Sequence, residues 1–227
     1  MAIDTAQKRE ASLQFGRVGS AGTRTPTGTT SAFLRGETLG HYYQSSGTAT
    51  VYPTGDGSIG DWTDETGVGT TNLWSHVDEA VLSPTDADYI QASTISSISA
   101  VFLLLGDMPG DFVTMGSTIV VKFRGRNLTS GDFGPVGIYQ SDETTALTDT
   151  STPATTGTLA NYTLTLNVTG ATSLAAWNGA RLKFATDNSA ACDLEVTAVQ
   201  VDVTYSATAA STPGAGTNQN ASVLLAM

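Results

Sequence analysis

The sequence lacks features on which several classes of protein depend. Among 227 residues there is one cysteine, Cys192. A single thiol cannot form a disulfide within the chain, so packing, backbone pairing or partner subunits must supply the stability. The longest apolar run, "AVFLLLG" at 100–106, is far shorter than the ~20 residues of a membrane-spanning helix. The opening "MAIDTAQKRE" has no apolar signal core. We therefore expect neither secretion by the general route nor a membrane anchor.

Recognisable catalytic and cofactor motifs are also missing. The two histidines, His41 and His76, belong to no HExxH helix, and no GxSxG elbow accompanies them. One cysteine and two distant histidines offer too few ligands for a thiolate zinc site. No glycine-rich phosphate loop stands between a strand and a helix. These absences predict a protein that is not an enzyme and has no cofactor.

The residues that are abundant favour strands. Thr, Val and Gly are frequent, whereas Lys and Glu, which fill exposed helices, are scarce. Alternation of apolar and polar residues begins near residue 48. The plainest case is "NYTLTLNVTG" at 161–170, where Leu164 and Leu166 face one way and Thr163 and Thr165 the other.

About eight strands are expected. They lie at 46–55 (stopped by Pro53), at two places within 86–106, at 116–127, 133–141 and 161–170, in the part of 173–188 that carries Leu182 and Phe184, and at 192–206. In the last strand the apolar parity changes, which predicts a bulge near Ala198–Val199. With one short helical turn near 173–179 and no long helix, the pattern predicts an all-β fold. We expect an antiparallel two-sheet sandwich of jelly-roll type over residues 47–206.

The two ends of the chain differ from this body. Residues 1–46 read as an extended arm, and residues 207–227 as a flexible tail that ends in the apolar sequence "VLLAM". Residues 1–36 carry a net charge of +3, whereas the rest of the chain carries −14. A basic arm with isolated apolar residues predicts docking onto an acidic protein neighbour, because the acidic body would be repelled by nucleic acid. The expected partner-binding residues are Lys8, Arg9, Phe15, Arg17, Arg24, Phe33, Arg35, Val223, Leu224 and Leu225.

One acidic, tryptophan-bearing run, "TGDGSIGDWTDETGVGTTNLWSHVDEA" at 54–80, allows three interpretations. A glycosidase would use two of its carboxylates beside aromatic platforms. A calcium loop would draw weakly matching ligands from Asp56, Asp61, Asp86 and Asp88, although the EF-hand spacing fails. The third interpretation, tight turns in a β protein, is the one we favour. If the protein binds glycans, Trp62 and Trp74 are the candidate stacking residues.

The same region carries a resemblance. The steps Gly60–Thr63, Asn72–Trp74, Val77–Glu79 and Asp88–Ile90 are similar to a stretch of small jelly-roll proteins encoded among the virion genes of tailed bacteriophages. The closing strand "LEVTAVQVDVTY" also resembles theirs. The resemblance implies a virion structural protein assembled in the host cytoplasm, most simply a capsid decoration protein. Its partners would be the major capsid protein or other virion subunits, and it would form a homo-oligomer, a trimer being favoured.

An alternative keeps the phage setting and changes the role. The chain is then a carbohydrate- or receptor-binding module of a tail or head fibre, or a structural protein of the tail or neck. A glycan-binding role requires exposed aromatic rings, whereas a decoration role requires only the arm and the tail.

Overall fold

The computed structural model describes residues 44–95, 97–129, 131–187 and 192–208. Its strands are β1 (Gln44–Val51), β2 (Pro53–Asp56), β3 (Thr63–Asp64), β4 (Ile90–Ile95), β5 (Ala100–Leu105), β6 (Phe112–Asn127), β7 (Gly137–Tyr139), β8 (Ala160–Asn167), β9 (Arg181–Ala185) and β10 (Cys192–Thr208). Two short helices accompany them, the 3-10 helix η1 (Leu73–His76) and α2 (Leu174–Trp177). No helix among these residues is long and apolar enough to cross a membrane.

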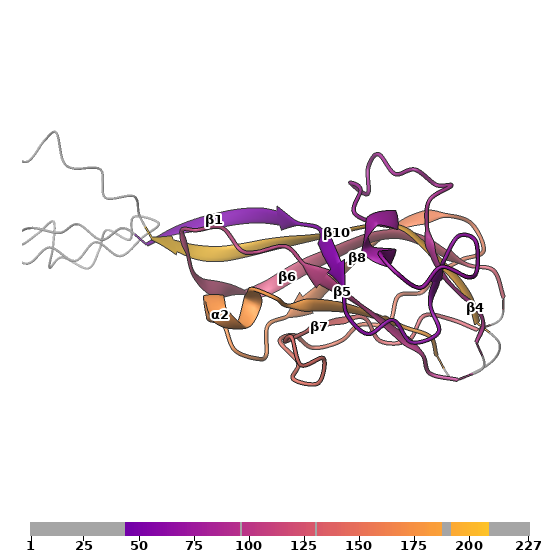
Figure 1. The fold of residues 1–227 in the computed structure, drawn as a ribbon. Coiled ribbons are helices and arrows are strands. Elements are labelled where there is room, and N and C mark those ends of the chain that lie inside the picture. The colour runs from indigo at the N-terminus through magenta and orange to yellow at the C-terminus, as the bar shows by residue number, and fades with distance from the viewer. Residues whose placement is uncertain (1–43, 96, 130, 188–191, 209–227) are drawn as a thin grey trace, which may run out of the picture. The chain divides into compact units, whose positions relative to one another are not determined.

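The strands form two antiparallel sheets, as the alternating pattern predicted. The larger sheet has the order β3-β4-β10-β6-β8, with β1 also paired to β10. The smaller sheet has the order β2-β5-β9-β7. Figure 1 shows β10 running beside β1 and β6, with β5 and β7 in the second layer. The all-β two-sheet sandwich is therefore confirmed, and residues 47–206 form one compact unit.

The first strand stops before Pro53, as expected, but Pro53 itself begins a second strand that we did not expect. The segment 46–55 contributes to two strands, because β1 stops at Val51 and β2 begins at Pro53 in the other sheet. Proline has no N–H to donate, so it suits the first residue of an edge strand, and β2 is the edge of the smaller sheet. The single residue Tyr52 links the two layers.

The core lies between the sheets and is rich in aromatic rings. Phe123 of β6 lies 5.6 Å from Phe133 and 5.2 Å from Phe184 between ring centroids, and all three are fully buried. Tyr162 stacks on Phe123 at 5.1 Å. The two layers are thus joined through one aromatic cluster.

The predicted change of phase in β10 is confirmed by its ion pairs. Arg126 pairs with Glu195, and Lys122 pairs with Asp202, both at 2.6 Å. The two cations have the same parity on β6, whose pairing with β8 is regular over this stretch. Their acidic partners have opposite parity on β10, so the strand changes phase between them. The backbone N–H of Val199 donates to Val77 outside the sheet at 2.9 Å.

The cysteine is a core residue. Cys192 is fully buried at the start of β10. Burial, together with a hydrogen bond to Asp187, raises the pKa of its thiol to about 11. The thiol is therefore protonated at neutral pH and packs as a small apolar group.

We expect Phe123→Ala to lower the free energy of unfolding by about 3–5 kcal/mol, because it removes a fully buried ring and leaves a cavity. Urea denaturation followed by tryptophan fluorescence measures the change. Thr163→Ala, at an exposed position on the neighbouring strand β8, is the control and should change stability by less than about 0.5 kcal/mol. Equal losses in the two variants would contradict the assignment of Phe123 to the core.

Candidate functional site

The two tryptophans proposed for glycan stacking have different environments. Trp62 is fully buried, and its ring centroid lies 6.5 Å from that of Phe133. A ring without solvent exposure cannot stack on a sugar, so the prediction for Trp62 is wrong. Trp74 lies in η1 and is half-buried.

The four predicted calcium ligands do not form one site. The carboxylate of Asp56 accepts hydrogen bonds from the backbone N–H groups of Leu73 and Trp74, at 3.0 and 2.8 Å, and so fixes the start of η1. Asp86 forms a bidentate pair with Arg124, at 2.6 and 2.7 Å.

The other two predicted ligands also have separate positions. Asp61 is exposed, and its backbone N–H donates to Ser99. Asp88 contacts His76. In the described part of the chain, the group that brings three metal-ligating side chains together is Asp64, Glu65 and His76. Spacing gave no signal for this group, because the packing of η1 against β3 creates it.

The partner-binding residues predicted in the arm and the tail lie outside the described residues. They are Lys8, Arg9, Phe15, Arg17, Arg24, Phe33, Arg35, Val223, Leu224 and Leu225.

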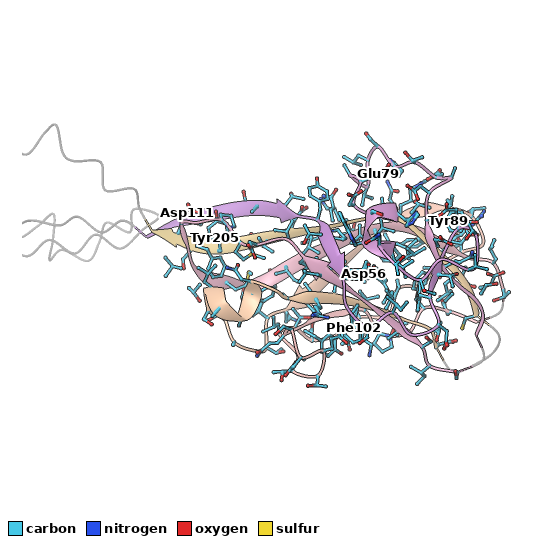
Figure 2. All side chains as sticks on the ribbon, in the orientation of Figure 1. Asp56, Glu79, Tyr89, Phe102, Asp111 and Tyr205 are labelled. Atoms are coloured by element: carbon cyan, nitrogen blue, oxygen red, sulfur yellow. The ribbon has the colours of Figure 1, made fainter. Side chains whose placement is uncertain are left out.

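A different aromatic surface appears on the smaller sheet, on the face turned away from the core. Val101 and Leu103 of β5 are fully buried, so Phe102 between them points to the opposite face, where its neighbours leave it only 8% exposed. Phe102 pairs with Lys183 of β9, and Arg181 pairs with Tyr139 of β7. Figure 2 labels Phe102 beside β5, away from the Glu79 and Tyr89 loops. We call Phe102, Tyr139, Lys183 and Arg181 the outer platform.

Lysine covers the aromatic rings of the outer platform. The rings of Phe102 and Tyr139 meet edge to face, with their centroids 5.7 Å apart. The ammonium of Lys183 lies 5.8 Å from the centroid of Phe102 and 5.5 Å from that of Tyr139. Among the described residues, no carboxylate forms an ion pair with Lys183. The ammonium therefore rests on two π faces and remains available to an anionic ligand.

An anchored ion pair borders the platform. The carboxylate of Glu143 contacts Arg181 and accepts a hydrogen bond from the N–H of Ser58 at 2.9 Å. Burial alone would raise the pKa of Glu143, but the hydrogen bonds from Ser58 and the charge of Arg181 outweigh it, and the pKa is lowered. The Nε of Arg181 is buried without a hydrogen-bond partner in the described residues. This edge therefore offers fixed polar groups beside the rings.

Two glycines leave room for side chains around the platform. A Cβ on Gly57 would lie 2.4 Å from the guanidinium of Arg181, and one on Gly137 would lie 2.8 Å from Thr150. Larger residues would push these neighbours across the surface.

The sequence signal that we missed is the apolar residue Phe102 at an outward position of a sandwich strand.

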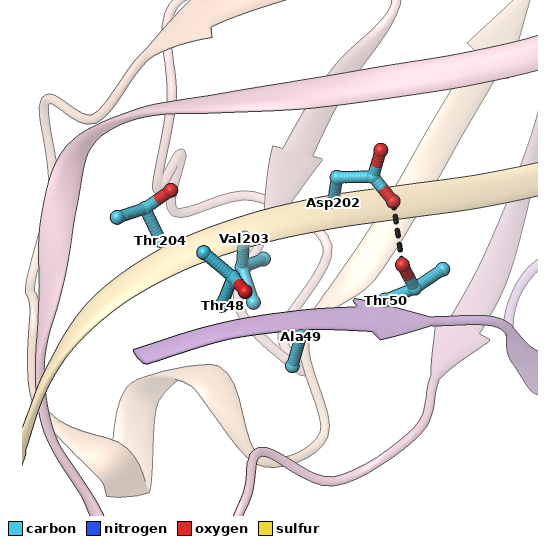
Figure 3. Close-up of a pocket in the computed structure, with 6 residues that line it drawn as sticks. All are labelled: Thr48, Ala49, Thr50, Asp202, Val203 and Thr204. Atoms are coloured by element: carbon cyan, nitrogen blue, oxygen red, sulfur yellow. Dashed lines mark hydrogen bonds between the residues drawn. The ribbon is translucent and has the colours of Figure 1, made fainter. Parts of the chain in front are cut away.

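A second surface feature is a polar groove on the larger sheet. It has a volume of about 370 Å³ and is lined by residues 48–50 of β1 and 202–204 of β10. Figure 3 shows the Thr50 hydroxyl donating to Asp202, at 2.7 Å. Asp202 is also paired with Lys122. No aromatic side chain is among its lining residues, so the groove offers hydrogen bonds without a stacking surface.

Solved structures with a similar layered arrangement include sugar-binding proteins. The C-terminal CBM6 of LamC from Zobellia galactanivorans is 11% identical, with 68% of this chain and 98% of that chain covered and a TM-score of 0.38. A family 29 carbohydrate-binding module from Piromyces equi is 14% identical, with 70% and 91% covered and a TM-score of 0.36. The enzymatically active domain of tailspike protein 4 of bacteriophage CBA120 is 12% identical, with 70% and 19% covered and a TM-score of 0.39.

No protein-family model and no curated protein sequence matches the chain. The chain spans about a fifth of the tailspike structure. TM-scores below 0.5 describe a loose likeness of sandwich folds, from which neither a ligand nor a site can be transferred.

The turn that presents Glu143 depends on its neighbour Asp142. The Asp142 carboxylate accepts from the backbone N–H groups of Thr144 and Thr145 and from the Thr145 hydroxyl. The Thr145 hydroxyl is the largest of the effects that lower the pKa of Asp142 to about 2.

We expect carbon-detected NMR titration to place the pKa of Asp142 near 2, and Thr145→Val to raise it toward the ordinary 3.8. Because the folded pKa is lowered, the turn is stabilised above about pH 4 and loses this stabilisation as the pH falls toward 2. Thr163→Val, at an exposed position on β8, leaves the turn intact and serves as the control. An Asp142 pKa near 3.8 in the unmodified protein would contradict the turn geometry.

Proposed function

We propose that the protein is a non-catalytic carbohydrate-binding β-sandwich whose ligand lies on the outer platform. The observation that supports this function best is the half-buried ring of Tyr139 on an outward sheet face, which packs edge to face against Phe102 and lies beside the ammonium of Lys183. One face of a pyranose ring carries mainly C–H groups, which pack well against the electron-rich face of an aromatic ring. Ligand sites typically combine such apolar surface with a few placed polar groups.

Little free energy is needed to move the Lys183 side chain away from the two rings. A cation–π contact at a solvated surface contributes about 0.5–1 kcal/mol. Lys183 can therefore swing aside when a sugar ring stacks on Tyr139, and its ammonium then lies at the rim of the sugar. The ligand class that fits best is a glycan with acidic sugars, because Lys183 has no anionic partner of its own among the described residues.

The platform is better suited to binding than to hydrolysis. Glycosidases use two carboxylates on either side of the bond that they break. Glu143 is the carboxylate that borders the platform, and it is already held by Ser58 and Arg181. A lowered pKa also makes it a poor general acid at neutral pH.

Binding of the labelled protein to an array of neutral and acidic glycans tests this proposal. We expect retention of acidic glycans, and we expect Tyr139→Ala to weaken it at least tenfold because the stacking surface is lost. Lys183→Ala should weaken binding to acidic glycans and leave neutral ones unchanged. Trp74→Ala, which alters the half-buried ring in η1, should bind as the unmodified protein does.

Lys122→Ala is the matched control, because it removes a lysine from the larger sheet. Failure of the unmodified protein to bind any glycan, or equal loss in Lys122→Ala and Lys183→Ala, would contradict the proposal. Loss confined to Trp74→Ala would move the glycan site to η1.

A second candidate function is the capsid decoration role, and exposed apolar side chains favour it. Leu82 is 87% exposed and Val68 is 81% exposed. Both lie in loops between β3 and β4. The loop around Leu82 is ordered by a hydrogen bond from the backbone of Thr85 to Glu79. An exposed leucine on an ordered loop is suited to insertion into a neighbouring subunit.

Cosedimentation with virions assembled without the protein tests this role. We expect Leu82→Asp to reduce occupancy at least tenfold, because it places a charge in an apolar contact. Leu128→Asp alters a leucine that is 45% exposed elsewhere on the surface and is the control. Deletion of residues 1–40 examines the arm separately. Full occupancy in both Leu82→Asp and the deletion would contradict the decoration role.

A further inference from the structure

Four metal-ligating side chains converge beside the short strand β3. They are Asp64, Glu65, His76 and Asp88, and we call them the His76 cluster. The donor atoms of Asp64, Glu65 and His76 lie within 4.8 Å of one another. The Nδ1 atom of His76 lies 3.1 Å from Oε2 of Glu65 and also contacts Oδ1 of Asp88.

The imidazole cannot satisfy the carboxylates around it. Nδ1 carries at most one proton, so it donates to one carboxylate at a time. Asp88 forms the hydrogen bond with Nδ1. Oε2 of Glu65 is sealed from solvent and has no hydrogen-bond partner among the described residues. A buried carboxylate oxygen without a donor is costly, and a bound cation removes that cost.

The positive side chains of the surrounding elements are engaged elsewhere. Arg124 is paired with Asp86, and Arg126 with Glu195. The amide of Gln91 donates to the backbone carbonyl of Asp64 and brings no charge. Within the described residues, the ion-pair partner of both Glu65 and Asp88 is His76. Three carboxylates thus surround a side chain that carries at most one positive charge.

The backbone holds the ligands in place before any ion arrives. Oδ1 of Asp64 accepts hydrogen bonds from the hydroxyl and N–H of Thr66, at 2.6 and 3.0 Å, and from the N–H of Gly69 at 3.1 Å. Asp64 also pairs with Ile90 in the β3–β4 ladder, which brings the segment before Ile90 alongside Glu65.

The histidine is fixed by the cap of its helix. Asp56 accepts from the first two N–H groups of η1, and His76 is the last residue of that helix. Two of the ligands therefore lie at elements whose positions are set by backbone hydrogen bonds. A site assembled in this way needs little rearrangement on binding.

We propose that the His76 cluster is a binding site for a divalent transition-metal ion, with Zn²⁺ as the best fit. The donor set is one imidazole nitrogen and carboxylate oxygens. Zinc takes this set in four-coordinate sites, whereas Ca²⁺ and Mg²⁺ take oxygen ligands. A bound ion cross-links η1 to the β3–β4 ladder and so stiffens the loops that carry Val68 and Leu82.

Isothermal titration calorimetry of chelator-treated full-length protein, with ZnCl₂ as the sole titrant, tests the site. We expect one zinc ion per chain and a melting temperature that rises with free zinc. His76→Ala and Asp88→Asn should each weaken zinc binding at least tenfold. CaCl₂ should bind at least tenfold more weakly than ZnCl₂.

Two controls keep the result specific. His41→Ala removes the other histidine of the chain, and Asp78→Asn alters an exposed acid two residues after His76. Both should bind zinc as the unmodified protein does. Circular dichroism and melting without metal verify that each variant is folded, and Asp88→Asn carries the test if His76→Ala is not. Absent binding, binding unchanged in both cluster variants, loss in His41→Ala, or tighter calcium binding would each overturn the proposal.

Discussion

The pairing of β10 with three other strands is the constraint on which the structure depends. β10 is 17 residues long. In the larger sheet it lies between β4 and β6 and also pairs with β1. If the inward and outward alternation of β10 were unbroken, the apolar side chains of one part of the strand would be buried and those of the other part exposed. Because the phase changes between Glu195 and Asp202, the apolar side chains of both parts of β10 face the core. At the change, the backbone N–H of Val199 donates to the carbonyl of Val77, the residue that follows η1.

Much of this fold follows from periodicity. The regular alternation of Leu164 and Leu166 with threonines predicted β8. The two strands expected within 86–106 are β4 and β5, and β5 lies between β2 and β9. The parity change in β10 was visible because valine and leucine report burial directly. The second strand that begins at Pro53 was not predicted, because a missing N–H is compatible both with the end of one strand and with the start of an edge strand.

The site residues were harder to predict, for a physical reason. Burial of Trp62 depends on Phe133, which is distant in sequence, and the meeting of His76 with Glu65 depends on how η1 packs against β3. Residue types in an acidic loop carry no information about such contacts. Asp56 shows the same limit. An aspartate that caps a helix cannot be told from an aspartate that binds an ion by its residue type alone. Phe102 was hidden inside an apolar run that appeared to need no other explanation.

The lone thiol has a consequence for the surroundings in which this sandwich can persist. Cys192 is enclosed in the interior, its proton is held to a pKa of about 11, and no second cysteine exists in the sequence to join it. The folded unit therefore has no covalent cross-link to gain under oxidising conditions or to lose under reducing ones. Its stability therefore does not depend on a disulfide in either an oxidising or a reducing medium.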